Sequence, residues 1–145
     1  MGYPLPLGNI LDIVPAIVPV DLQTGANDGD WVSLRNAAGV LFLVFKGAGT
    51  AGDDPDIVIE QATAVAGTSS KALSAIRRVF LKEGTLTAVG AWTETVPVAA
   101  PDGDYQMDAT SAESQALVAF YVSADDLDTP NGFDCVRMRI ADIGN

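Results

Sequence analysis

Glycine and proline interrupt this sequence so often that a long helix has little room to form. The 145 residues include 14 glycines and 8 prolines, which are spread along the whole chain. Short runs rich in Val, Ile, Leu and Thr lie between these interruptions. Turn signals at intervals of roughly 8 to 12 residues are typical of all-β domains. The sequence therefore predicts a mainly β fold, an antiparallel β-sandwich or barrel of about seven to nine strands.

The alternation of apolar and polar side chains identifies the clearest strands. In the run CVRMRI, at 135–140, apolar residues alternate with two arginines, so one face should be buried and the other exposed. The run GVLFLVFK, at 39–46, is apolar at odd and even positions alike. We therefore expect this segment to be a central strand that is covered on both faces. Ser123 is expected to cap a single helical turn in ADDLD. Further strands are expected at 32–35, 57–63, 76–82 and 116–123.

The N-terminal segment MGYPLPLGNILDIVPAIVPV combines four prolines with many apolar side chains. The prolines disfavour a long helix, and the apolar content is unlike that of a flexible polar tail. We predict an extended arm over residues 1–24, followed by a single β domain over 25–145. Such an arm packs either on its own domain or on a neighbouring subunit. Its candidate interface residues are Tyr3, Pro4, Leu5, Leu7, Ile10 and Ile13.

The formal charge of −11, from 8 basic and 19 acidic residues, narrows the choice of partners. An acidic surface repels phosphate backbones and anionic lipids, so we expect neither a nucleic acid nor a membrane as partner. The longest apolar run is also far short of the ~20 residues of a membrane-spanning helix. The few basic residues could pair with acidic groups of the same chain, or contact an acidic partner or a sister subunit. The candidates for such a contact are Arg77, Arg78, Arg137 and Arg139.

No catalytic constellation can be assembled from this sequence. It contains no histidine, which removes Ser-His-Asp and Cys-His catalysis and the usual zinc ligands. The segment GTSSK, at 67–71, has neither the spacing of a phosphate-binding loop nor that of a Ser-x-x-Lys nucleophile site. We expect a polar turn there, a buried free thiol at Cys135, and neither enzymatic activity nor a cofactor. Asp-rich loops at 28–30, 53–56, 102–104 and 125–128 leave a calcium site open, although Asp and Gly are also ordinary turn residues.

Three stretches resemble a group of tailed-phage virion structural proteins. They are WVSLRN at 31–36, the segment IEQAT followed by GTSSKAL within 59–73, and DLDTPNGFDCVRMRIADIG at 126–144. A strand and a Gly/Asp loop separate the first two stretches, and LTAVGAWTET at 86–95 between the last two belongs to the same pattern, which covers about residues 31–144. The resemblance implies a capsid decoration (cement) protein on the exterior of an HK97-type shell, made in the host cytoplasm. It further implies the major capsid protein as a partner and self-association, commonly as a trimer. A tail or head–tail connector protein is the alternative within this group, and a calcium-dependent carbohydrate-binding β-sandwich on the virion is a further alternative.

Overall fold

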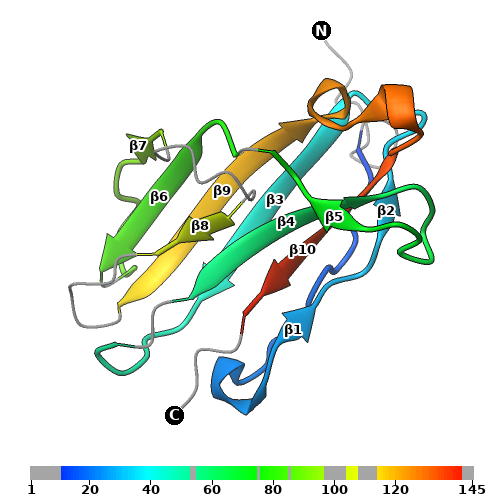
Figure 1. Cartoon of the computed structure of the whole chain (residues 1–145). Helices are drawn as coiled ribbons and strands as arrows, with labels where there is room; N and C mark the ends of the chain where they lie inside the picture. The colour runs from blue at the N-terminus through cyan, green and yellow to red at the C-terminus, as the bar shows by residue number, and fades with distance from the viewer. Residues whose placement is uncertain are drawn as a thin grey trace, which may run out of the picture.

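The computed structural model describes residues 11–52, 55–74, 76–84, 86–96, 104–107 and 114–141. Two antiparallel sheets pack face to face without closing into a barrel, as Figure 1 shows. The prediction of a mainly β fold is confirmed, and of the two expected architectures the sandwich is the one observed.

Sheet A has its centre in the pairing of β10 (Cys135–Ile140) with β4 (Asp56–Ala62). This pairing runs in continuous antiparallel register from Cys135 opposite Ala62 to Ile140 opposite Ile57. Four short strands flank the pair: β1 (Asn27–Asp28) and β2 (Val32–Ser33) both join β10, while β5 (Lys71–Ala72) and β8 (Asp104–Gln106) both join β4.

Sheet B has the strand order β3–β9–β6–β7. Its strands are β3 (Gly39–Lys46), β9 (Gln115–Ser123), β6 (Val79–Gly84) and β7 (Thr93–Thr95). Three single turns of 3-10 helix complete the described structure: η2 (Leu22–Thr24), η3 (Ala124–Asp126) and η4 (Thr129–Asn131). Ser123 caps η3 and forms a capping box with Asp126, which confirms the helical turn predicted there.

The core lies between the two sheets. Sheet A contributes the predicted apolar positions of β4 and β10, among them Ile57, Ile59 and Val136, none of which is exposed. Sheet B contributes alternate residues of β9 and β3, and Phe42 stacks on Phe120 with ring centroids 5.3 Å apart. In sheet A the outward side chains of β4 and β10, such as Glu60 and Arg137, are only partly buried. The half-buried pattern predicted for β10 is therefore confirmed.

Two sequence predictions about sheet B need correction. The strand at 39–46 is an edge strand, because within the described residues only β9 pairs with it. Its side chains at Leu41, Leu43 and Phe45 point away from the core and are exposed, so the expected cover on both faces is absent from the part of the chain that the structure describes. The strand predicted at 76–82 begins at Val79 instead. Although Ile76 is buried, Arg77 reaches out to the carboxylate of Asp126 near η3.

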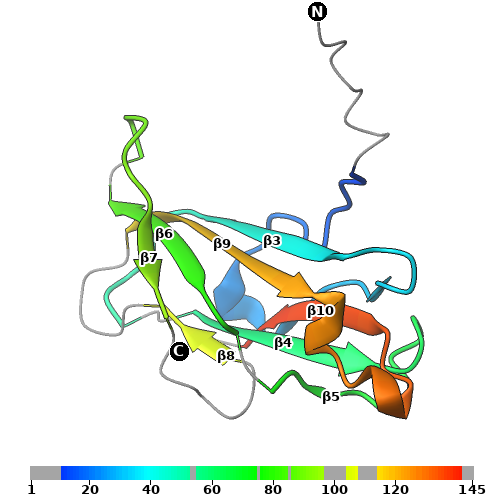
Figure 2. The same ribbon diagram turned by 90° about the horizontal axis from the view of Figure 1, so that it is seen from above.

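The described part of the arm, residues 11–24, is attached to its own domain at a few points. Ala16, Ile17 and Leu22 pack against the core, and the Asp30 amide donates a hydrogen bond to the Ala16 carbonyl at 3.2 Å. N-terminal to Ala16 the chain leaves the body near the start of β3 (Figures 1 and 2). Of the predicted arm contacts, Ile13 is described, and Tyr3, Pro4, Leu5, Leu7 and Ile10 lie outside the described residues.

Candidate interaction surface

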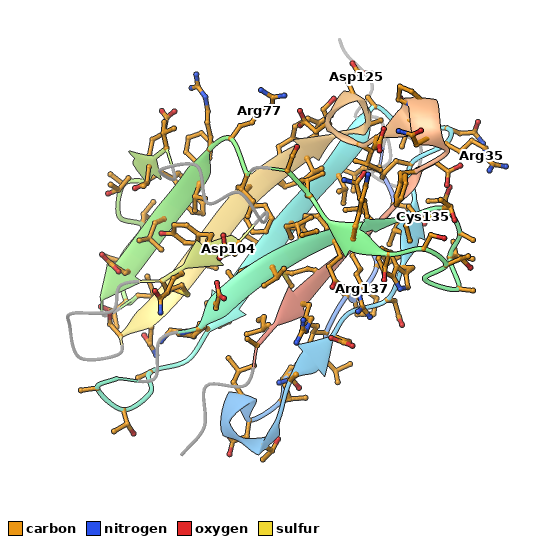
Figure 3. The ribbon with its side chains drawn as sticks, viewed as in Figure 1. Arg35, Arg77, Asp104, Asp125, Cys135 and Arg137 are labelled. Carbon is orange, nitrogen blue, oxygen red and sulfur yellow. The ribbon has the colours of Figure 1, made fainter. Side chains whose placement is uncertain are left out.

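Three of the stretches that carry the resemblance meet at one end of sheet A, whereas LTAVGAWTET supplies β7 of sheet B. The Leu34 amide donates to the Asp134 carbonyl at 2.7 Å, and β2 pairs with the start of β10. The Arg35 guanidinium forms an ion pair of 2.8 Å with the Asp134 carboxylate. Arg35 and Cys135 lie at this end of the molecule in Figure 3. The first and third stretches, about a hundred positions apart in sequence, are therefore adjacent in the fold.

Gln61 joins the second stretch to the third. Its side chain is 3% exposed, donates from Nε2 to the Ala72 carbonyl at 3.3 Å and accepts at Oε1 from the Asp128 amide at 2.8 Å. Lys71, the lysine of GTSSK, forms an ion pair with the Asp128 carboxylate. Its ammonium group also lies 4.1 Å from the centre of the Phe133 ring. Lys71 thus ties the turn between β4 and β5 to the segment before β10.

The same turn requires glycine at position 67. Gly67 has a φ of +74°, and a Cβ there would lie 2.7 Å from the indole nitrogen of Trp31. Both its backbone conformation and its contact with Trp31 therefore exclude larger residues. The other neighbour of the indole is Arg137, whose guanidinium carbon lies 4.8 Å from the ring centroid. Trp31 is thus enclosed between the turn and β10 and serves to pack the two together.

Hydrogen bonding and burial set the charge states in this cluster. A hydrogen bond from Lys71 holds the pKa of Asp128 below its ordinary value. The pKa of Asp134 is lowered chiefly by a hydrogen bond from the Cys135 thiol, with help from Arg35. Burial raises the pKa of Cys135, which confirms the prediction of a buried free thiol. A protonated, enclosed thiol is a packing group, because the reactive form of cysteine is the thiolate.

The predicted contact arginines of β10 pair with acidic groups of this chain. Arg137 Nε donates to Glu60 at 2.6 Å, and its guanidinium lies 3.3 Å from Asp28. Arg139 approaches the same Asp28 carboxylate at 3.2 Å. These four side chains connect β1, β10 and β4 across the outer face of sheet A.

The two arginines before β6, Arg77 and Arg78, lie away from those of β10, and they pair with different parts of the chain. Arg77 pairs with Asp126 at 2.6 Å, and Arg78 pairs with Glu94 on β7 at 2.7 Å. Figure 3 shows Arg77 well separated from Arg137. The four arginines therefore do not form one basic patch, and each has an acidic partner within the chain. Their role toward a second protein stays a prediction.

The acidic loops do not converge on a metal site within the described residues, where no group of three or more His, Cys, Asp or Glu side chains is placed to hold an ion. Asp53, Asp54 and Asp102 lie outside those residues. Asp56 lies opposite Gln106 and Asp104 lies opposite Val58, so the two carboxylates are diagonal neighbours across β4 and β8. The Oδ1 atom of each is buried without a hydrogen-bond partner in the described structure. Burial and the nearby Asp104 charge raise the pKa of Asp56.

The outward side of sheet B is apolar and uncovered. Leu41, Leu43 and Phe45 on β3 are 63%, 61% and 73% exposed. Leu41 pairs with Tyr121 of β9, which is 51% exposed, and Leu43 pairs with Ala119 of β9. Charged side chains begin only on β6 and β7, at the far margin of this surface. We call the surface the outer face of sheet B and define it by Leu41, Leu43, Phe45, Phe80, Leu117, Ala119 and Tyr121.

The open edge of β3 continues this surface. Its first seven residues include no proline and no charged side chain, and Lys46 is the first charge along the strand. Long, apolar edge strands of this kind readily pair with another chain, and proteins usually protect them. The sequence has an apolar residue at every position from 40 to 45, and this pattern predicts a central strand that is covered on both faces. The outer face of sheet B was therefore missed as a candidate site.

No helix among the described residues is both long enough and apolar enough to cross a bilayer. No protein-family model matches the chain, and no curated protein or solved structure matches it significantly. The resemblance to tailed-phage virion proteins therefore rests on the sequence stretches themselves.

Proposed function

We propose that this chain is a non-enzymatic virion structural protein that binds the outer surface of an HK97-type phage capsid and stabilises it. The observation that carries this proposal is the uncovered outer face of sheet B, together with the open edge of β3. Large apolar patches on soluble proteins usually mark sites of protein association. A β3 strand that is apolar on both sides, but covered on one, fits a protein that completes its packing in an assembly.

Charge favours the exterior of a shell over its interior. The net charge is −11, and Arg77, Arg78 and Arg137 each pair with an acidic group of the chain. Such a surface is repelled by packaged DNA but can lie against a protein shell. Many copies on one shell would also multiply a weak individual contact through avidity.

The stretches that resemble phage virion proteins support the proposal because their residues stabilise the fold. Their residues interlock at one end of sheet A, through Gln61, Lys71 and Trp31, and serve to hold strands together. Residues whose role is to hold the fold together suit a structural protein, whose work is done by surfaces rather than by a reactive group.

The test is to purify particles of the phage or prophage that encodes this chain and to image them at subnanometre resolution. We expect the chain in many copies on the outside of the shell. Particles made without it should lose integrity at a lower temperature, and added purified chain should restore them. If the chain is missing from purified particles, or is found only in the tail or at the neck, the proposal is wrong. The neck or tail outcome would instead identify a connector or tail component.

A further inference from the structure

We infer that the open edge of β3 and the adjoining outer face of sheet B receive the N-terminal arm of a second copy of this chain. Leu11–Val14 of one copy would add a strand beside β3 of the next, as in β-strand addition. This goes beyond the proposed function, because it concerns contacts between copies in solution whether or not a capsid is present.

The arm of the lone chain has exposed apolar side chains without cover. Ile13 is 76% exposed, Val14 is 53% exposed and Leu11 is 45% exposed, although Ala16 and Ile17 close by are packed on the core. The arm is therefore fixed to its own body at Ala16, and residues 11–15 before that point are exposed.

The local sequence suits the arm for strand addition. Pro15 restricts Val14 to extended conformations, and residues 11–14 form no helix or turn in the structure. None of these four residues is a proline, and each has an amide available for pairing. Leu11 and Ile13 lie on one side of an extended segment, where they can pack beside Leu43 and Phe45.

The low charge of the outer face of sheet B and of the N-terminal arm favours contact between two copies of the chain. The outer face of sheet B has no charged side chain on β3 or β9, and Asp12 is the only charged side chain among residues 1–20. Most other surfaces of a chain with net charge −11 would repel one another. An arm with a single charged side chain can reach the uncharged face of a second copy while the acidic bodies stay apart.

The available areas agree with a stable contact. Taking roughly 200 Å² for a large side chain, the exposed parts of Leu41, Leu43, Phe45 and Tyr121 amount to about 500 Å². The exposed parts of Leu11, Ile13 and Val14 add roughly 300 Å² on a similar basis. In a reciprocal exchange, where two copies each donate an arm and receive one at the same interface, each copy would cover up to the ~800 Å² per partner of a standard interface.

The first experiment measures the oligomeric state of the purified full chain by sedimentation and light scattering. We expect a discrete oligomer, and we expect Ile13→Lys and Leu43→Lys each to raise its dissociation constant by at least ~30-fold, as for the loss of an anchor residue. Val65→Lys is the matched control, because Val65 has the same 61% exposure as Leu43 but lies in the turn between β4 and β5. Unchanged circular dichroism would show that the variants still fold. A chain that is monomeric at high concentration, or an oligomer unaffected by both substitutions, overturns the inference.

The second experiment identifies which arm occupies the face. Chains with Ile13→Cys are mixed with chains with Leu43→Cys and treated with a short bismaleimide; the native Cys135 is buried and protected. We expect a cross-linked dimer only when both variants are present. A double variant that instead cross-links within single chains at high dilution would show that each arm covers its own face, and would refute exchange. Failure of the particle experiment above would leave these results unchanged, so the two proposals can fail separately.

Discussion

Gln61 provides the sharpest test of how the resembling stretches hold the fold together. Replacing it by leucine keeps the approximate size of the side chain but removes both hydrogen bonds, the one to the Ala72 carbonyl and the one from the Asp128 amide. A buried polar group left without its partner costs roughly 1–3 kcal/mol. Two such groups, less the gain from a more apolar side chain, give an expected loss of about 2–3 kcal/mol in the free energy of unfolding.

The assay is urea unfolding followed by circular dichroism. With a slope of roughly 2–3 kcal/mol per molar, the midpoint of the Gln61→Leu variant should fall by about 1 M. Gln106→Leu is the control, because Gln106 is an exposed residue of β8 in the same sheet. Surface substitutions of that kind usually change stability by less than ~0.5 kcal/mol. If the two variants lose the same stability, Gln61 does not hold β5 and the segment before β10 in place, and our account of the cluster is wrong.

Three further predictions test single positions. Gly39→Ala should lower the thermal midpoint in a melting experiment, because its Cβ would lie 2.4 Å from the Val122 carbonyl oxygen, a backbone atom that cannot move aside cheaply. Asp56→Asn should stabilise the fold at neutral pH, and the gain over the parent chain should shrink as the pH falls toward 3.8, since a raised pKa favours folding only while the carboxyl is protonated. The gain should be measured by urea unfolding at several pH values, and a gain independent of pH would contradict this assignment. Cys135 should resist alkylation in the native protein and react fully in urea, as thiol labelling followed by mass spectrometry will show.

The sequence predicted correctly those features of the fold that depend on neighbouring residues alone. Alternation in β10 identified its buried face correctly, because a half-buried strand shows which side meets the core. The two-residue strand β1 was not predicted, since Asn27 and Asp28 pair through backbone atoms that any residue offers. For β3 the pattern predicted that both faces need cover. It could not say that the second cover would be absent from the described part of the chain.

The contacts of the candidate site residues could not be predicted either, because they join residues that are far apart in the sequence. Lys71 and Asp128 lie far apart in sequence, and no local feature indicates that they form an ion pair. The arginine candidates were chosen by clustering, whereas Arg77 and Arg78 are neighbours that pair in different directions. Adjacency in sequence therefore gave little information about which charges share a surface.

The position of β10 has a consequence for the order in which the protein can fold. This strand lies in the middle of sheet A, between β4 and the pair β1 and β2, yet it is the last strand described along the chain. Until β10 has been synthesised, β4 lacks its main neighbour and the first strands have nothing to join. Such long-range pairing slows folding, and incomplete sheets are prone to aggregate. During translation, sheet A must therefore wait for its final strand, and a ribosome that stalls before Cys135 would hold a chain with two unfinished sheet edges.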